Sequence, residues 1–196
     1  MPVLAGGAVL AVVGTGVGLK KLDYDQIARA GILSASFFVA SLIHVPIGPA
    51  SVHLIFNGAV GLLLGWAAFP AILVALILQA VFFQFGGITT LGVNTIVMAL
   101  PAVICCFFFA PLIRKNRGYA ISAAFAVGSL SVLLSGMIVA LALMFTEHGF
   151  LEVAGLVLAA HIPVMGIEGI ITVFLVLFLK KVHPDLLPGR EDKTGH

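Results

Sequence analysis

The sequence predicts an all-α integral membrane protein, a bundle of about seven transmembrane helices. Hydrophobic residues make up 61% of the 196 residues and charged residues only 9%, whereas a soluble domain carries roughly a quarter charged residues. A helix needs about 20 apolar residues to cross the hydrocarbon core of a bilayer, with roughly 17 as a practical minimum. Seven apolar runs reach that length, and none shows the alternating pattern of a transmembrane β-barrel strand.

The predicted spans are separated by prolines and glycines, which break helices. The first run is followed, not preceded, by Lys20 and Lys21, so it is a retained helix and not a secretory signal. We expect one transmembrane domain over residues 1–182 and a polar cytoplasmic tail over residues 183–196. The spans lie at residues 3–19, 28–44, 52–68, 70–86, 94–113, 118–146 and 162–179.

The positive charges predict the orientation of the chain in the membrane. All ten Lys and Arg residues lie in or within a few residues of the first connection, the fifth connection or the tail, and with seven spans these segments share one face. Lys and Arg favour the cytoplasmic side. We therefore expect the N-terminus outside and the C-terminus in the cytoplasm.

Four of the six histidines fall on or near the predicted outer side, where no segment contains Lys or Arg. Neutral imidazole is a good ligand for divalent first-row transition metals. A lone histidine at a helix end is also commonly a hydrogen-bonded interfacial residue, and spacing alone does not separate the two interpretations. The four candidates are His44, His53, His148 and His161.

Polar residues near these histidines favour an outward-facing pocket. Asn57 lies one helical turn beyond His53, and such a pair shares a helix face. The glycine-rich connection over residues 86–94 follows the fourth span and could dip inward to close a cavity. The further candidates in the fourth span and in this connection are Gln79, Gln84, Thr89 and Asn94.

Glu168 is the only acidic residue inside a predicted span. Intramembrane carboxylates are costly and often functional, and a buried structural hydrogen bond is an equally reasonable role here. Glu168 lies close to two turns after His161, so the two share a face if the helix is continuous. Pro163, as a first-turn proline of that helix, would leave His161 just outside it.

The remaining motifs indicate packing and exclude catalysis. Gly61 and Gly65 form a small-xxx-small pair that allows close helix contact, and Cys105 and Cys106 are small packing residues. The sequence contains neither a phosphate-binding loop nor an HExxH motif, and no Ser-His-acid arrangement is legible. We expect a protein that is not an enzyme and has no ATPase site of its own.

Four stretches carry a resemblance to a known family: SVHL at residues 51–54, NG at 57–58, LLGWAAFP at 63–70 and QFGGITTLGVN at 84–94. They resemble the CbiM/NikM family, the substrate-binding (S) membrane components of energy-coupling-factor transporters for cobalt and nickel. The resemblance covers about residues 28–187 and adds Ser51 to the pocket candidates.

By this resemblance, the chain is a multi-pass protein of the bacterial inner membrane with an all-helical seven-span fold. It captures divalent cobalt or nickel outside, as a transported substrate and not as a permanent cofactor, and supplies cobalamin biosynthesis or metalloenzymes. Its partners are a transmembrane coupling (T) protein, two cytoplasmic ATPases and a small accessory membrane subunit. The coupling protein would dock on small residues, with Ala30 and Ser34 or Gly61 and Gly65 as candidates.

The family's metal site uses the N-terminal amine, a backbone amide nitrogen, the imidazole of a histidine at position two and the histidine of the S-x-H motif. Only the last has a match here, His53, and His44 is a weaker candidate. The chain begins Met1-Pro2, and proline has no N–H to lose. We therefore expect that the true beginning is missing and that this chain binds metal poorly. The LIHVPIGP version of the motif is closer to cobalt-type members.

Two functions of other classes remain open. One is a haem-binding electron-transfer subunit with axial ligands among His44, His53, His148 and His161, which would show a visible absorption band. The other is a structural membrane scaffold, which would bind no metal. Equilibrium metal binding separates the scaffold from the transporter subunit.

Overall fold

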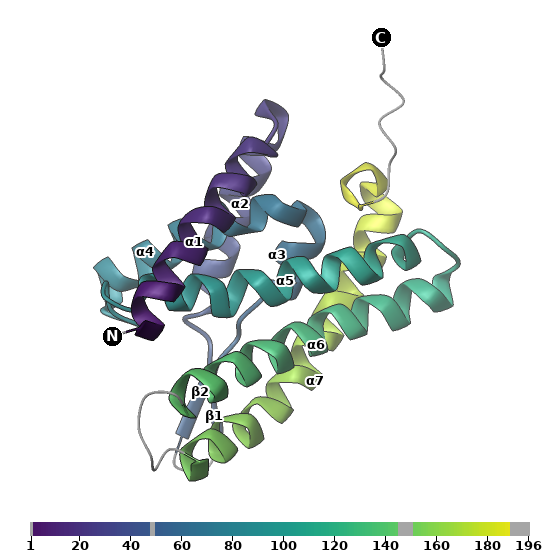
Figure 1. Cartoon of the computed structure of the whole chain (residues 1–196). Coiled ribbons are helices and arrows are strands. Elements are labelled where there is room, and N and C mark those ends of the chain that lie inside the picture. The colour runs from purple at the N-terminus through teal and green to yellow at the C-terminus, as the bar shows by residue number, and fades with distance from the viewer. Residues whose placement is uncertain (1, 48–49, 145–150, 189–196) are drawn as a thin grey trace.

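The computed structural model describes residues 2–47, 50–144 and 151–188. Within them the chain is helical apart from one short hairpin and the connecting turns (Figure 1). The helices are α1 (Pro2–Lys20), α2 (Tyr24–Ala40), α3 (Asn57–Leu64), α4 (Ala68–Phe83), α5 (Leu91–Ile113), α6 (Arg117–Met144) and α7 (Leu151–Val182); the 3-10 turns are η1 (Gly65–Ala67) and η2 (Pro184–Leu186); the strands are β1 (His44–Ile47) and β2 (Ala50–His53).

Five stretches of the described chain are long and apolar enough to cross a membrane, fewer than the seven predicted. α2 has only 17 residues. The predicted third and fourth spans, 52–68 and 70–86, form one helical stretch of 27 residues that η1 interrupts. The described residues thus contain six helical stretches, five of which are candidate spans: Val3–Lys20, Asn57–Phe83, Leu91–Ile113, Arg117–Ala142 and Leu158–Val182.

Residues 50–53, which include the predicted start of the third span, are a β-strand. β1 and β2 pair antiparallel, with His44 opposite His53. Pro46 lacks the N–H that a helix interior needs, and the β-branched residues around it favour extended backbone. The prediction of a helix beginning at residue 52 was therefore wrong, and α3 begins five residues later.

The break inside the 27-residue stretch lies at Gly65 and not at the predicted Phe69-Pro70 joint. Gly65 has φ 54° and ψ −124°, which is a conformation that residues with a side chain rarely adopt. Pro70 is instead the third residue of α4, where its missing N–H costs no intrahelical hydrogen bond. Gly65 therefore ends α3 and does not contribute to a helix contact, since no atom lies within 4 Å of an added Cβ.

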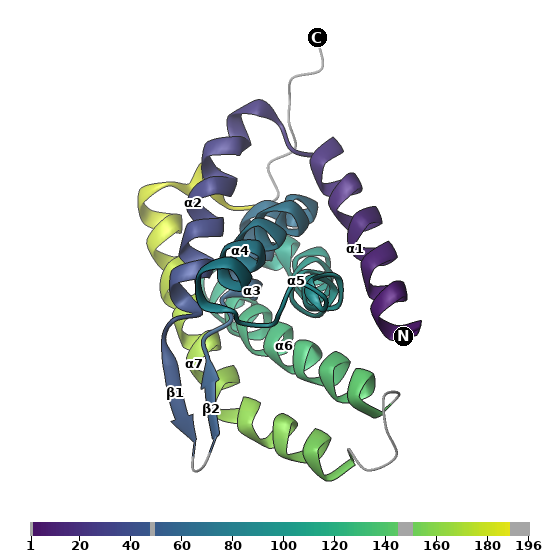
Figure 2. The ribbon, with the colours of Figure 1, turned by 90° about the vertical axis from the view of Figure 1, so that its left-hand side faces the viewer.

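The short helix α3 lies at the centre of the molecule, and all its residues except Leu63 are buried. Figure 2 shows α3, α4 and α5 between α1 and α2. At Gly61, α3 approaches α5 so closely that an added Cβ would collide with the carbonyl of Ala102. Two apolar clusters meet at α3, one including Phe37, Phe69 and Ile72 and the other including Ile113, Val127 and Val176.

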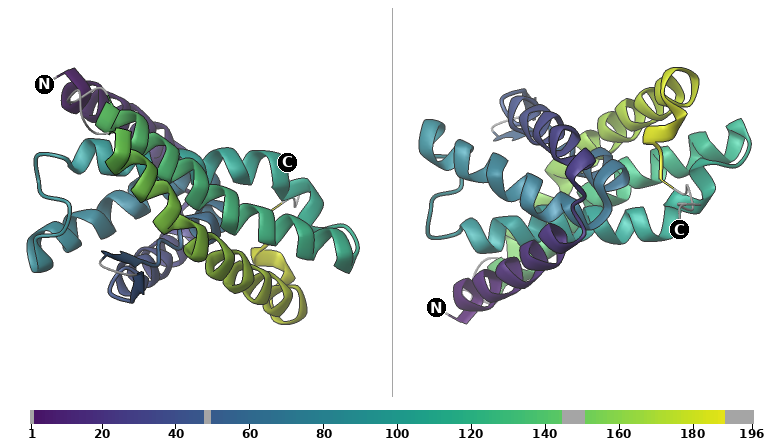
Figure 3. Two further views of the ribbon diagram at one scale, coloured as in Figure 1. Left: turned by 90° about the horizontal axis from the view of Figure 1, so that it is seen from below. Right: turned by 90° about the horizontal axis from the view of Figure 1, so that it is seen from above.

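α6 and α7 pack against each other along much of their length, as the left view of Figure 3 shows. Small residues let the two backbones approach each other. An added Cβ on Gly128 of α6 would lie 2.5 Å from the carbonyl oxygen of Glu168 on α7. Ser129, next to it, donates a hydrogen bond to the carbonyl of Met165 at 2.8 Å.

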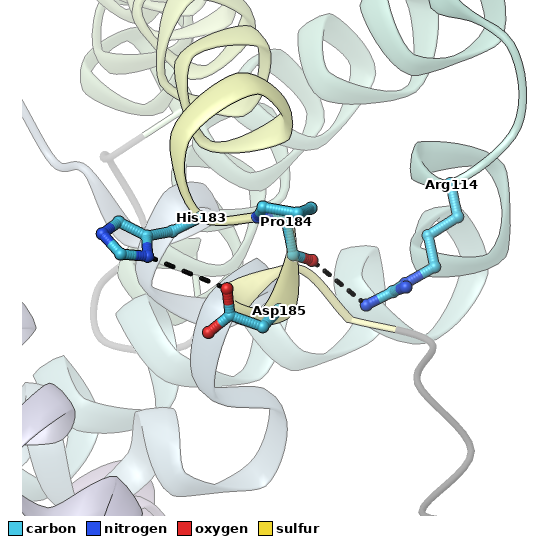
Figure 4. A network of polar contacts seen from close by, with 4 residues as sticks. All are labelled: Arg114, His183, Pro184 and Asp185. Atoms are coloured by element: carbon cyan, nitrogen blue, oxygen red, sulfur yellow. Dashed lines mark hydrogen bonds and ion pairs between the residues drawn. The ribbon is translucent and has the colours of Figure 1, made fainter.

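Long basic side chains close the last turns of α5 and α7, a region we call the basic end: residues 112–117 and 180–188. Lys180 Nζ donates to the carbonyls of Ile113 at 2.8 Å and Lys115 at 2.9 Å. Arg114 donates to three carbonyls around η2, including that of Pro184 at 3.3 Å (Figure 4). Cations suit these positions because the last carbonyls of a helix have no intrahelical partner.

Candidate functional site

A cavity of about 190 Å³ lies among β2, α2, α4, α5 and the loop between α4 and α5. It brings together residues that are far apart in the sequence, and six of them belong to the sequence motifs described above: His53, Phe85, Gly86, Gly87, Leu91 and Asn94. Its lining is Phe37, His53, Leu76, Gln79, Phe85, Gly86, Gly87, Leu91, Asn94 and Met98. The hairpin, residues 84–94 and the first turns of α1 and α3 are called the pocket end below.

Among the histidines whose side chains the structure describes, His53 is the one that lines this cavity, and its ring contacts the backbone next to it. The Nδ1 atom lies 3.0 Å from the carbonyl oxygen of Leu54. Because a carbonyl oxygen only accepts, the proton of this hydrogen bond is on Nδ1, and the lone pair is then on Nε2. Metal-binding histidines are typically oriented in the same way, by a hydrogen bond from the ring nitrogen that does not bind the metal. The imidazole is thus arranged in the form that binds a divalent metal.

The loop between α4 and α5 owes its shape to three residues with positive φ: Gln84 at 57°, Gly86 at 73° and Gly87 at 67°. Thr90 donates to the carbonyls of Gly86 and Gly87, and Asn94 Nδ2 donates to the Gly86 carbonyl at 3.4 Å. These bonds fold the loop back onto the first turn of α5. The glycine-rich connection therefore forms one wall of the cavity.

Only some of the polar residues predicted to form a pocket line the cavity. Gln84 ends α4 and does not line the cavity, whereas Gln79 does, with its Nε2 donating to Ser41 Oγ at 2.9 Å. Thr89 is also outside the lining, and its neighbour Thr90 makes the loop's hydrogen bonds. The signal for Gln79 was present in the sequence, as a buried amide in an otherwise apolar helix.

Asn57 and His53 do not share a helix face, because His53 is in a strand and Asn57 is the first residue of α3. Asn57 is fully buried. Its Nδ2 donates to the carbonyl of Met98 at 2.9 Å and to Ser135 Oγ at 3.0 Å. Since Met98 lines the cavity, Asn57 supports the cavity wall from behind.

One prediction about α7 concerns the surroundings of Pro163. α7 runs from Leu151 to Val182 with Pro163 inside it, so the prediction that His161 lies outside the helix was wrong. Pro163 is tolerated because neighbouring helices in a membrane bundle can satisfy the freed backbone groups. His161 lies against Gly136 of α6, outside the cavity lining.

Glu168 also lies outside the cavity lining but reaches the segment that carries His53. It is 1% exposed, and its Oε1 accepts hydrogen bonds from the backbone N–H groups of Ile55 at 2.6 Å and Phe56 at 2.8 Å. This is the buried hydrogen-bonded arrangement, one of the two roles left open for this residue by the sequence.

The described donor atoms make an incomplete metal site. No group of three or more His, Cys, Asp or Glu side chains among the described residues is placed to hold a metal ion. The side chains of His44 and Ser51, and all of His148, lie outside what the structure describes. One imidazole, two amide side chains and nearby carbonyls remain, and these suit a weakly held transition-metal ion.

The first turns of α1 lie against the first turn of α5. An added Cβ on Gly92 would lie 2.6 Å from Ala8 Cα, and one on Gly7 would lie 2.5 Å from Val93 Cγ2. Asn94, which lines the cavity, follows Val93 directly. The beginning of α1 is thus close to the rim of the cavity.

Comparison with known proteins agrees with the motifs. The sequence profile of CbiM, described as the cobalt uptake substrate-specific transmembrane region, matches residues 1–186. A Haemophilus influenzae protein whose name points to metal transport is 41% identical over 194 residues, covering 97% of this chain and 94% of that protein. The fused nickel transport protein NikMN of Rhodobacter capsulatus is 32% identical, and the match covers 89% of this chain and 57% of that protein.

The fold is also found in a solved structure. The crystal structure of a truncated transition metal transporter superposes with a TM-score of 0.74 at 25% identity, covering 92% of this chain and 94% of that one. Relatives named as fused NikMN and CbiMQ proteins imply partnership with other transport components. The chain belongs to the CbiM/NikM family and is a multi-pass membrane component of cobalt and nickel uptake, not an enzyme.

Proposed function

We propose that the chain is the substrate-capture subunit of an energy-coupling-factor importer and that it takes up divalent cobalt, or nickel, through His53. The observation that carries this proposal is the position of His53, which comes from the S-x-H motif and lines the same cavity as the glycine-rich loop and Asn94. Both metals accept imidazole nitrogen. Cobalt is the preferred substrate, in keeping with the LIHVPIGP motif, and the imported metal serves cobalamin biosynthesis or metalloenzymes.

The cavity opens to the outside in this proposal, and the basic end faces the cytoplasm. The support is the charge distribution: the pocket end carries no Lys or Arg, whereas Arg114, Lys115, Lys180 and Lys181 gather at the basic end. Lys and Arg favour cytoplasmic segments. The proposed orientation therefore presents imidazole, without competing cations, to the metal outside.

Transport requires partners, because the sequence contains no nucleotide-binding motif. The proposed set is a transmembrane coupling protein, two cytoplasmic ATPases and a small accessory membrane subunit. Three of the four small residues considered as the docking surface of the coupling protein lie in internal contacts. Ser34 donates to the Ala71 carbonyl at 2.8 Å, Ala30 is buried, and Gly61 packs on α5, so these residues are occupied by internal contacts.

Equilibrium binding of cobalt to the purified full chain tests the proposal, with His53→Ala as the variant and His183→Ala as the control. His183 lies at the basic end and is 63% exposed. Loss of His53 should weaken cobalt binding by more than roughly a hundredfold, beyond what is usual for residues that only orient a ligand. The control should bind as the unchanged chain does.

The same experiment separates the alternatives. A chain that binds no cobalt or nickel at any accessible concentration, and whose His53→Ala variant assembles normally with its partners, would be a scaffold. A purified protein with a haem absorption band would be an electron-transfer subunit. If His183→Ala loses as much cobalt affinity as His53→Ala, the metal site is not at the pocket end.

A further inference from the structure

The segment between β2 and α3 has an unusual backbone and no side-chain capping hydrogen bond of its own. Phe56 has φ 58° and ψ 10°, in the left-handed region, and makes no side-chain capping hydrogen bond at the start of α3. A bulky residue adopts this conformation only when its surroundings impose it. Leu54 and Ile55, next to it, are buried, so water does not supply partners for their backbone.

The partner comes from α7, more than a hundred residues away. Glu168 Oε1 accepts the N–H groups of both Ile55 and Phe56, and the first turn of α3 follows at once. A carboxylate at this position also interacts favourably with the positive end of the helix dipole. Glu168 is the only acidic residue in the five candidate spans, and burial of a lone carboxylate is costly unless hydrogen bonds compensate it.

Glu168 is itself held in place by the α6–α7 pair. Its carbonyl packs on Gly128 of α6 and accepts a hydrogen bond from Thr172 at 2.8 Å. At the other end of the segment, Leu54 N donates to the Ile43 carbonyl at 3.1 Å. The chain around His53 is thus anchored by the hairpin on one side and by Glu168 on the other, and the Leu54 carbonyl between these anchors orients the imidazole.

The geometry points to Glu168 as a positioning residue for metal capture: its carboxylate fixes the turn over residues 54–56 and so holds the His53 imidazole at the cavity. This inference rests on the proposed function of His53. Glu168 does not act as a ligand, since it is absent from the cavity lining and one of its oxygens already serves two amides. It links the position of α7 to the geometry of the metal site.

Two variants and one control test the inference. Glu168→Met keeps the length of the side chain and removes both acceptors, and Glu168→Gln keeps an oxygen and removes the charge. Ser129→Ala removes a part-buried hydrogen bond between α6 and α7, to the carbonyl of Met165, and leaves the bonds from Ile55 and Phe56 to Glu168 intact. This variant therefore measures how weaker packing of α6 against α7 affects the His53 ring signal and cobalt affinity.

The first readout is the ¹⁵N NMR signal of the His53 ring in the metal-free chain, assigned among the six histidines with His53→Ala. The Nδ1 signal should shift in Glu168→Met, shift less in Glu168→Gln and stay in place in Ser129→Ala. This readout does not depend on metal binding, so it distinguishes a failure of this inference from a failure of the proposed function.

The second readout is cobalt affinity. Glu168→Met should lose about tenfold or more, the usual effect of removing a group that orients a metal ligand, and Glu168→Gln should recover part of the loss. Unchanged ring signals and unchanged affinity in both variants would overturn the inference, as would an equal loss in Ser129→Ala. If Glu168→Met does not fold, Glu168→Gln decides, and an unchanged Glu168→Gln then counts against the inference.

Discussion

At the pocket end and at the basic end, the backbone groups of helix ends obtain their hydrogen-bond partners in opposite ways. Both contain helix ends whose backbone groups lack intrahelical partners. At the basic end, Arg114 and Lys180 donate to five carbonyls between them. At the pocket end, one carboxylate, that of Glu168, serves two amides at the start of α3, and the loop over residues 84–90 folds on its own carbonyls.

The difference explains where a ligand can bind. Cationic side chains at the basic end cap the carbonyls at the end of α5 and in the η2 segment. The pocket end relies on positive-φ backbone, glycines and a hairpin, which leave a cavity with imidazole and amide groups in its lining. Irregular backbone at membrane depth persists only where protein buries it or where it lines a cavity.

The largest effect on cobalt affinity is expected from adding nitrogen donors to the site at the pocket end. Joining a short segment that begins Met-His ahead of Pro2 adds an amine, an amide and a second imidazole, and the first turns of α1 lie beside the rim of the cavity. Cobalt affinity should rise by several orders of magnitude. Binding should also acidify an unbuffered solution, because amide and imidazolium groups release protons to the solvent when they become ligands.

A segment that begins Met-Ala is the matched control and should leave affinity nearly unchanged. Isothermal titration of both extended chains, with the pH recorded, makes the comparison. Tight cobalt or nickel binding by the chain without any extension would contradict the prediction. Other nitrogen donors, such as His44 or His148, would then have to complete the site.

Composition and periodicity were sufficient for the fold class but not for the number of spans. The 61% hydrophobic content and the long apolar runs predicted a membrane bundle of helices, and the structure contains one. The hairpin and the short α3 were missed because residues 52–68 are as apolar as a spanning helix. The tertiary contact with Glu168, 113 residues after Ile55, supports the turn that the chain makes there.

Part of the candidate site could be predicted from the sequence. The motifs placed His53 and Asn94 in the candidate set, and the structure brings both to one cavity together with the glycine-rich connection. Helical spacing failed for Asn57, because the i, i+4 rule presupposes a continuous helix. Of the two candidate glutamines, Gln79 lines the cavity and Gln84 does not, since Gln84 lies just beyond the last residue of α4, Phe83.

A smaller effect is expected when the loop at the pocket end is distorted. Gly86→Ala places a Cβ against the amide of Asn94, at φ 73°, where a side chain costs roughly 1–2 kcal/mol. Displacement of Asn94 should weaken cobalt binding by about tenfold, the range for groups that support a ligand. The control is Gly16→Ala, on an open face of α1, where no atom lies within 4 Å of the new Cβ. Equal cobalt affinities for the two variants would refute the role of the loop.

The smallest effect on metal binding is expected at the basic end. Arg114→Ala removes donors to the carbonyls of Pro184, Leu187 and Pro188, and because Arg114 is exposed the loss should be about 1 kcal/mol of folding free energy. Thermal unfolding in detergent should shift down by a few degrees relative to Arg117→Ala, an exposed arginine of the same turn that makes none of these bonds.

Cobalt affinity of Arg114→Ala should equal that of the unchanged chain, because the bonds it removes lie at the opposite end of α5 from Asn94 and the cavity. Parallel titration of Arg114→Ala and Gly86→Ala measures this contrast directly. A loss of affinity in Arg114→Ala as large as in Gly86→Ala would mean that the two ends are coupled. The connection would then run through α7, which carries both Glu168 and Lys180, and capping at the basic end would influence how His53 is held.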